Sequence, residues 1–167
     1  FRTKLSENLF KGLSPWLSKL PGGLIHVNIV GCALFAAISG SSAATVATVG
    51  KMSIPELRKR KYPERLLLGS LAGSGTLGLL IPPSIILIIY GVTIEDSIAK
   101  LFMAGIFPGI MIALIFMSYV IIWSVLNKKL MPKSLENFSF SKKIERSKQL
   151  LPVITLIVSV IGSIYTG

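Results

Sequence analysis

The sequence predicts an all-α integral membrane protein with a re-entrant helical hairpin and a proline-broken transmembrane helix. Hydrophobic residues make up 51% of the chain and charged residues only 15%, whereas soluble domains carry about 25% charged residues. Seventeen of the 18 Lys and Arg residues lie in three blocks, at 1–20, 51–65 and 128–148, and the exception is Lys100. Basic blocks that alternate with uncharged runs are typical of cytoplasmic loops between membrane segments.

The composition also excludes several classes of function. The net charge of +11 does not indicate nucleic-acid binding, because no aromatic residues interleave with a basic face. One Cys and one His are too few ligands for a zinc site. The sequence shows no nucleophile–base pair of the kind that would indicate an enzyme. His26 is expected to be a packed side chain, and Tyr90 an interfacial anchor rather than part of a substrate pathway. We expect no organic cofactor.

Residues 1–20 are predicted to form an interfacial amphipathic helix, because apolar residues recur there at helical spacing among basic ones. The alternative is the end of a preceding connector. The chain starts with Phe1 rather than Met and ends in an apolar run. We therefore expect a fragment of a longer protein, without a signal peptide.

Residues 21–50 contain no charged side chain and are flanked by basic residues at both ends. One straight helix of this length would span about 45 Å, which exceeds a hydrocarbon core of about 30 Å. Two half-helices joined at the polar residues 39–42 would instead reach the midplane and return, leaving both basic flanks on the cytoplasmic side. We predict this re-entrant hairpin, with a single long tilted helix as the alternative.

Residues 51–65 are predicted to form a cytoplasmic basic loop. Within it, Ser53 and Glu56 have the spacing of a capping box, which predicts the start of a short helix that ends near Lys61.

Residues 66–94 are predicted to form a discontinuous transmembrane helix. Pro82 and Pro83 remove two amide donors and disfavour helix before them, so the break is expected within 78–84. The run ends at the acidic pair Glu95 and Asp96, which places that end outside the cytoplasm.

Residues 98–127 are predicted to form a transmembrane helix that returns to the cytoplasm, with Gly105 and Gly109 permitting close helix contact. Residues 128–150 are then a second cytoplasmic basic loop, and residues 151–167 start the next transmembrane helix. Every basic block lies on one side in this topology.

The two breaks together indicate a binding site. The ends of discontinuous helices expose amide groups that attract anions and carbonyl groups that coordinate sodium. Hydroxyl groups cluster near the breaks, at Ser39, Ser41, Ser42, Thr45, Ser74, Thr76 and Ser84. For any single one of them, close packing is the alternative, as it is for the small-residue pair Gly69 and Gly73. Residues 73–78 also match a dinucleotide-binding glycine pattern, but no strand precedes them and the prolines follow soon after.

Four segments carry a resemblance to a known family: GGLIHVNIV at 22–30, LFAAISGSSA at 34–43, GLLIPPS at 78–84 with Tyr90-Gly91, and KLFMAGIFPG at 100–109. In this order they resemble the large membrane (M, DctM-like) subunit of TRAP (tripartite ATP-independent periplasmic) transporters. The resemblance covers about residues 1–125.

This resemblance implies an elevator-type transporter repeat in a multi-pass protein of the bacterial inner (cytoplasmic) membrane. It implies sodium-coupled uptake of an organic acid, of the sialic acid or C4-dicarboxylate class. The implied partners are a small four-helix Q membrane subunit, a periplasmic substrate-binding protein and membrane lipid. A sodium-coupled carboxylate carrier without a binding protein, and a non-transporting membrane scaffold subunit, remain as alternatives.

The resemblance also assigns roles to matching positions. Sodium would be held at Ser39, Ser42, Gly78, Ile81 and Pro83, by hydroxyls or backbone carbonyls. The substrate would lie beside it, near Ser41, Thr45, Ser74, Thr76 and Ser84. Family members vary after the hairpin serines, where this chain has Ala43-Ala44-Thr45.

Overall fold

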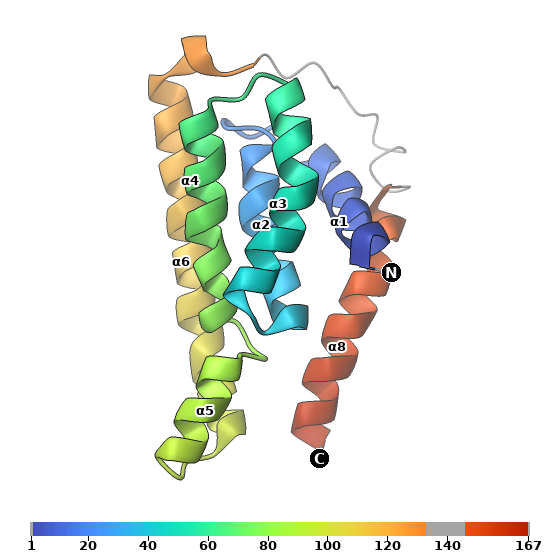
Figure 1. The fold of residues 1–167 in the computed structure, drawn as a ribbon, viewed down its shortest axis with the longest axis vertical. Helices are drawn as coiled ribbons and strands as arrows, with labels where there is room; N and C mark the ends of the chain where they lie inside the picture. Colours follow the sequence, from blue (N-terminus) through green and yellow to red (C-terminus); the bar gives the residue numbers. More distant parts are fainter. Residues whose placement is uncertain (1, 133–145, 167) are drawn as a thin grey trace.

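The computed structural model describes residues 2–132 and 146–166, and all the regular structure in these two ranges is helical (Figure 1). This confirms the predicted all-α class. The longer helices are α1 (Arg2–Leu17), α2 (Ile25–Ser39), α3 (Ser42–Lys59), α4 (Glu64–Gly75), α5 (Ile85–Thr93), α6 (Ile98–Leu126) and α8 (Leu151–Thr166). Short 3-10 turns are η1 (Thr76–Leu79), η2 (Lys128–Leu130) and η3 (Lys148–Leu150).

Helix α2 is the centre of the bundle. It contacts α1, α3, α4, α6 and α8, and ten of its residues are buried. Its apolar side chains, among them Ile25, Ile29 and Cys32, form the core with leucines of α1, α3 and α4. A helix that is apolar on all sides is stable only when neighbours surround it, and α2 has such neighbours.

Helices α2 and α3 form an antiparallel pair that turns at Gly40 and Ser41 (Figure 1). Gly40 has a φ of 60°, in the left-handed region that favours glycine, and its N–H donates to the carbonyl of Ala36 at 2.9 Å. Ser41 is extended, and its side chain accepts a hydrogen bond from the Ala44 N–H at the start of α3. The alternative of one long helix over 21–50 is therefore wrong.

Helix α3 differs from the sequence prediction at its amino end. The expected helix start at Ser53 is wrong, because α3 already begins at Ser42 and continues through Ser53 and Pro55 to Lys59. Packing against α2 and α4 stabilises α3 through the proline, and Ser53 is fully buried there rather than acting as a cap. Much of the expected loop over 51–65 is thus helical, and the connection to α4 is only residues 60–63.

The break in the second uncharged run lies where the prolines predict it. Helix α4 tightens into η1 at Thr76, the chain is irregular from Leu80 to Ser84, and α5 begins at Ile85. The Pro82–Pro83 peptide bond is cis. Helix α5 continues beyond the end of the α2–α3 pair (Figure 1).

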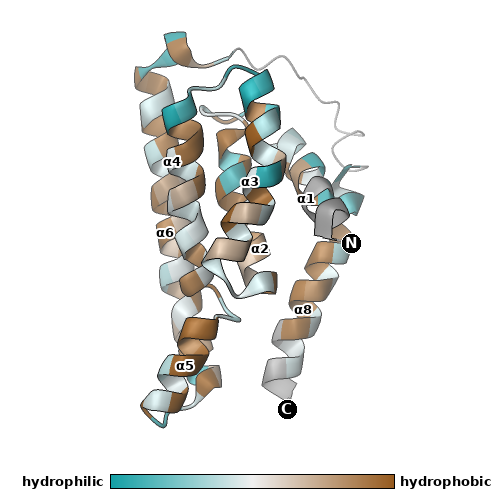
Figure 2. Ribbon diagram, viewed as in Figure 1, coloured by the Kyte–Doolittle hydropathy of each residue, from teal (hydrophilic) through white to brown (hydrophobic). Residues whose placement is uncertain are grey.

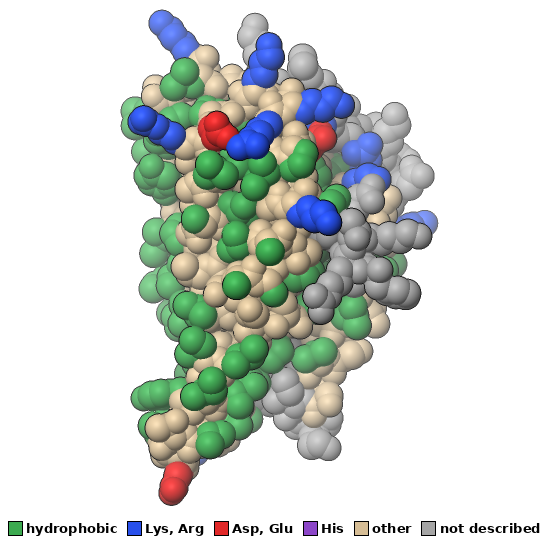
Figure 3. All heavy atoms as spheres, in the orientation of Figure 1, with side chains coloured by type: hydrophobic (Ala, Val, Ile, Leu, Met, Phe, Trp, Pro, Cys, Tyr) green, Lys and Arg blue, Asp and Glu red, His purple; other side chains and the backbone are tan. Residues whose placement is uncertain are grey.

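The outer helices carry an apolar surface and the charges gather at the ends. Within the described residues, α6 is the one helix that is long and apolar enough to cross a membrane, and it covers most of the predicted segment 98–127. Brown, hydrophobic ribbon runs along α5, α6 and α8, and teal marks the α3–α4 end (Figure 2). Lys and Arg side chains lie mainly towards that end, while an acidic side chain marks the opposite tip, beyond α5 (Figure 3).

Candidate functional site

The hairpin tip between α2 and α3 lies directly against the break between η1 and α5. The N–H of Ile85, the first residue of α5, donates to the Gly40 carbonyl at 3.3 Å. A Cβ added at Gly40 would lie 2.8 Å from the carbonyl oxygen of Pro83, and one at Gly78 would lie 3.0 Å from the amide nitrogen of Ser42. The tip and the break therefore touch backbone to backbone.

A connected group of hydroxyls orders the tip from inside. The Thr45 hydroxyl donates to the Ser41 carbonyl at 2.7 Å and lies 2.8 Å from the Ser39 hydroxyl. The Ser39 hydroxyl also accepts from the Ser41 N–H at 3.3 Å. Thr45 is 0% exposed while Ser39, Ser41 and Ser42 are partly exposed. The buried threonine thus holds the turn, and the serines form its accessible surface.

The break presents oxygen atoms because its prolines cannot donate. In a regular helix, N–H groups at positions 82 and 83 would donate to the carbonyls of Gly78 and Leu79, but proline has no N–H. The buried Ser84 hydroxyl donates to the Leu79 carbonyl at 2.8 Å. The carbonyl of Gly78, beside the hairpin tip, receives no such bond from Pro82.

Helix α6 supports the break from behind. A Cβ at Gly105 would lie 2.6 Å from the Leu80 carbonyl oxygen, and one at Gly109 would lie 2.8 Å from Cγ1 of Ile81. The predicted close contact at these two glycines is confirmed.

Four helix ends meet at this point. The amino ends of α3 and α5 begin at Ser42 and Ile85, and the carboxyl ends of α2 and η1 lie at Ser39 and Leu79. Amino ends attract anions, whereas the carbonyls at carboxyl ends attract cations. The described residues contain no cluster of three His, Cys, Asp or Glu side chains, so the ligands that this site offers are neutral hydroxyl and carbonyl oxygens.

The predicted site residues fall into two groups. The tip residues Ser39, Ser41, Ser42 and Thr45 lie together, against the break residues Gly78 and Pro83. Ser84 is buried in the same break, where Ile81 also lies, with its side chain against α6.

Ser74 and Thr76 bond instead within their own turn of helix. The buried Ser74 donates to the Leu71 carbonyl at 3.4 Å, and the exposed Thr76 donates to the Gly73 carbonyl at 2.7 Å.

Gly40 is a site residue that the sequence reasoning did not single out. Its place between two serines, at the end of an apolar helical run, was the available signal, because glycine commonly ends a helix in the left-handed conformation.

The opposite end of the hairpin is held by Tyr62, which lies in the connection between α3 and α4. The N–H of Leu24 donates to the Tyr62 hydroxyl at 3.1 Å. Burial raises the pKa of Tyr62, against the smaller opposing effects of the Leu24 N–H and of Arg60. The phenol is therefore neutral at physiological pH and accepts this hydrogen bond.

The arrangement of a hairpin tip against a helix break can be compared with known families. The family model "Tripartite ATP-independent periplasmic transporter, DctM component" matches residues 2–167. The chain belongs to this DctM family. Members are components of TRAP transporters rather than enzymes, and the resemblance of the four segments is confirmed.

Individual relatives cover most of this DctM-family chain. A C4-dicarboxylate TRAP transporter large permease protein, DctM, of Pseudomonas aeruginosa is 40% identical over 146 residues, which are 87% of this chain and 34% of the relative. An isethionate TRAP transporter permease protein, DctMQ, of Oleidesulfovibrio alaskensis is 36% identical over 166 residues, 98% of this chain and 25% of the relative. A sialic acid TRAP transporter large permease protein, SiaM, of Vibrio cholerae is 34% identical over 165 residues, 98% of this chain and 38% of the relative.

This DctM-family chain thus spans 25–38% of the length of these relatives. Their names, with those of ectoine permeases at 34% identity, refer to several different substrates. Membership of the family therefore does not by itself define the substrate.

Proposed function

We propose that this chain is part of the membrane-spanning subunit of a sodium-coupled secondary transporter for a small organic acid. It acts in the bacterial inner membrane, and a periplasmic binding protein delivers the substrate. The observation that carries this proposal is the contact between the hairpin tip at Gly40–Ser42 and the proline-containing break at Gly78–Pro83. Such paired discontinuities form the ion and substrate sites of secondary transporters.

In this proposal sodium lies between the tip and the break. Its ligands come from Ser39 and Ser42 and from the carbonyls of Gly78, Ile81 and Pro83. Two features support this placement: Pro82, four residues after Gly78, has no N–H to donate to the Gly78 carbonyl, and Ser42 lies in direct contact with Gly78. Neutral oxygen atoms suit a hard monovalent cation, whereas a carboxylate cluster would favour a divalent one.

The organic acid lies beside the sodium, near Ser41, Thr45, Ser74, Thr76 and Ser84, of which Ser41 and Thr76 are at least partly exposed and the other three are buried. Helices α3 and α5 begin beside these residues, at Ser42 and Ile85, and their amino ends would attract its anionic group. The sialic acid or C4-dicarboxylate class remains our proposal, and the isethionate and ectoine names of other relatives widen the panel to be tested.

The mechanism follows from differential affinity. Sodium joins the tip to the break and so completes the anion site, and a ligand shifts a conformational equilibrium only by favouring one state. With sodium and substrate bound, the re-entrant hairpin and the membrane-spanning broken helix then move across the membrane together as an elevator. Helix α1 is the interfacial arm. The basic end of the molecule faces the cytoplasm. A small four-helix Q subunit supports the assembly, consistent with the DctMQ name of one relative.

The test is uptake by the full-length subunit with its partners in proteoliposomes, across a panel of organic acids, with and without sodium. We expect sodium-dependent uptake of one class in the wild type. Gly78→Ala should abolish it, because the new Cβ would press on the backbone of Ser42. Gly162→Ala is the matched control, since none of the described residues lies within 4 Å of a Cβ there. Sodium-independent uptake, or undiminished uptake by Gly78→Ala, would overturn the proposed site.

Two further results would redirect the proposal. Uptake without the binding protein would indicate a carrier of another kind. The absence of both uptake and any sodium-dependent shift in thermal stability would indicate a scaffold subunit.

A further inference from the structure

A cavity lies away from the hairpin tip, between α4 and α6 with α2 as its floor. Its volume is about 620 Å³, within the range of about 300–1,000 Å³ that is typical of small-ligand pockets. The walls are formed mainly by apolar side chains such as Leu66 of α4 and Ile115 and Phe116 of α6. Ile115 is 56% exposed, so the cavity opens onto the apolar outer surface of the bundle.

The cavity widens towards the basic end of the molecule. A Cβ added at Gly73 would lie 3.4 Å from the ring of Phe116, so α4 and α6 are in contact at that level. One helical turn earlier, a Cβ added at Gly69 would lie within 4 Å of no other residue that the structure describes. The two glycines of the predicted close-packing pair therefore differ, and only Gly73 packs against another helix.

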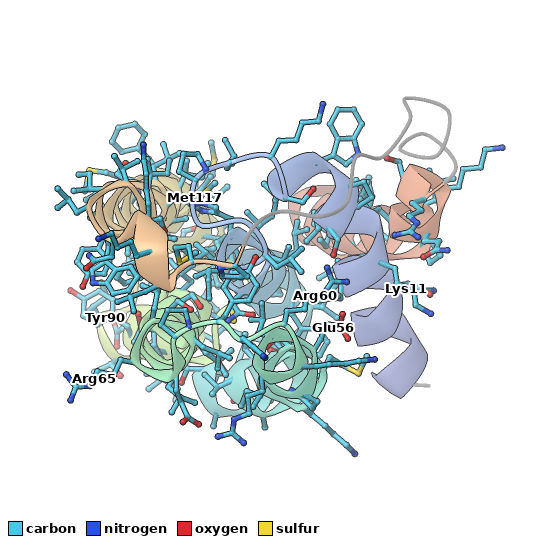
Figure 4. The ribbon with its side chains drawn as sticks, turned by 90° about the horizontal axis from the view of Figure 1, so that it is seen from above. Lys11, Glu56, Arg60, Arg65, Tyr90 and Met117 are labelled. Carbon is cyan, nitrogen blue, oxygen red and sulfur yellow. The ribbon has the colours of Figure 1, made fainter. Side chains whose placement is uncertain are left out.

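The wide end of the cavity carries hydrogen-bond donors. Arg65 lies in the first turn of α4, and Tyr119 and Trp123 lie in the last turns of α6. Arg65 points away from the bundle at its outer edge (Figure 4). The ion pairs of neighbouring residues join Arg58 to Glu64 and Arg60 to Glu56, and Arg65 has no ion-pair partner in the part of the chain that the structure describes.

These donors are suited to a headgroup at a membrane surface. A guanidinium group binds a phosphate in a bidentate manner, and Tyr and Trp side chains prefer the headgroup level of a bilayer. Below them the lining is apolar except for Ser70, whose hydroxyl donates to the Leu67 carbonyl of its own helix at 2.9 Å. The cavity is thus cationic at the membrane surface and apolar towards the bilayer centre, which is the polarity of a phospholipid.

We propose that this cavity binds one membrane phospholipid, with its phosphate on Arg65 and an acyl chain along Leu66, Gly69 and Phe116. A free phosphate would leave the apolar walls uncovered, and a lipid without phosphate would leave Arg65 without an anion. The site is separate from the proposed sodium and substrate site, and its test does not depend on transport.

The experiment uses the full-length permease with its membrane partner, purified in detergent and stripped of lipid. Phosphatidylglycerol with brominated acyl chains is added, and the quenching of tryptophan fluorescence is followed. We expect a saturable component of quenching that is lost in Trp123→Phe. Quenching that rises in proportion to added lipid without saturating, or that is unchanged in Trp123→Phe, would overturn the proposal.

Two glycine variants test whether the lipid enters the cavity. Gly69→Leu replaces glycine with a better helix former and directs the new side chain into the open space. We expect the half-saturating lipid concentration to rise about tenfold or more. Gly162→Leu is the matched control, because a Cβ at that position also has no neighbour within 4 Å among the described residues, and it should bind like the wild type. Equal binding by Gly69→Leu and the wild type would contradict the proposal.

The headgroup is tested with Arg65→Gln and three probes. This variant should weaken the binding of brominated phosphatidylglycerol about tenfold and leave the binding of brominated diacylglycerol unchanged. Inorganic phosphate should not displace the bound lipid. Displacement by phosphate alone would indicate a simple anion site.

A disulfide between Gly69→Cys and a cysteine on another protein segment would indicate that a helix fills the cavity.

Discussion

The substitution Gly40→Ala tests whether the geometry of the hairpin tip determines sodium affinity. The φ of 60° at this position costs an L-residue about 1–2 kcal/mol. The added Cβ would also lie 2.8 Å from the Pro83 carbonyl oxygen, and overpacking of this kind costs about 1–3 kcal/mol. The closed contact between tip and break therefore loses about 2–5 kcal/mol.

The assay is the sodium-dependent rise in melting temperature of the purified full-length permease. If sodium binds only the closed contact, the lower end of this range raises the half-saturating sodium concentration by up to about 30-fold. The same titration of Gly162→Ala should match the wild type, because a Cβ there meets no atom within 4 Å in the part of the chain that the structure describes. A wild-type sodium titration for Gly40→Ala would refute the reasoning, whatever its effect on the melting temperature itself.

Three further predictions concern the supports of the site. Thr45→Val removes the buried hydroxyl that bonds to the Ser41 carbonyl, so we expect a loss of about 1–3 kcal/mol in stability, with Thr45→Ser close to the wild type in denaturant titrations. Gly105→Ala places a Cβ 2.6 Å from the Leu80 carbonyl oxygen, and should lower the melting temperature by displacing α6, at a cost of about 1–3 kcal/mol. Because burial raises the pKa of Tyr62 above 10.0, its contribution to stability is complete below pH 10.0 and is lost as the pH rises towards the raised pKa. Tyr62→Phe should remove this alkaline loss in melting temperature, and a wild-type pH profile for this variant would contradict the assignment.

The locations of the helices and of the break were predictable because they depend on local breaker residues and on the lengths of the uncharged runs. The uncharged runs and their flanking charges define the segments, and the adjacent Pro82 and Pro83 remove two consecutive helical hydrogen bonds. The turn at 39–42 was predictable because a single helix of 30 residues exceeds the membrane thickness. These constraints require no knowledge of which helices are neighbours.

The start of α3 was not predictable in the same way. Ser53 and Glu56 have a capping-box spacing, but the chain before them is already helical from Ser42. Packing against α2 and α4 outweighs the local signal and the cost of Pro55 inside the helix.

The different roles of Gly69 and Gly73 were equally inaccessible. Their four-residue spacing predicts a shared packing face, yet only Gly73 meets Phe116. The distance between α4 and α6 at each level depends on the side chains of both helices. The spacing of the glycines within α4 carries no information about the side chains of α6. The cavity at Gly69 is therefore a property of the assembled helices.

The contact between the hairpin tip and the break is made of main chain, with Gly40 opposite the Pro83 carbonyl and Gly78 opposite the Ser42 amide. Most point mutations change side chains and leave main-chain atoms where they are, so a cation site built in this way, as proposed here, would persist while adjacent hydroxyls vary. A scaffold of this kind could change its substrate and keep the proposed coupling to sodium. The relatives named for dicarboxylate, isethionate, ectoine and sialic acid are the divergence that such a division between backbone and side chain would allow.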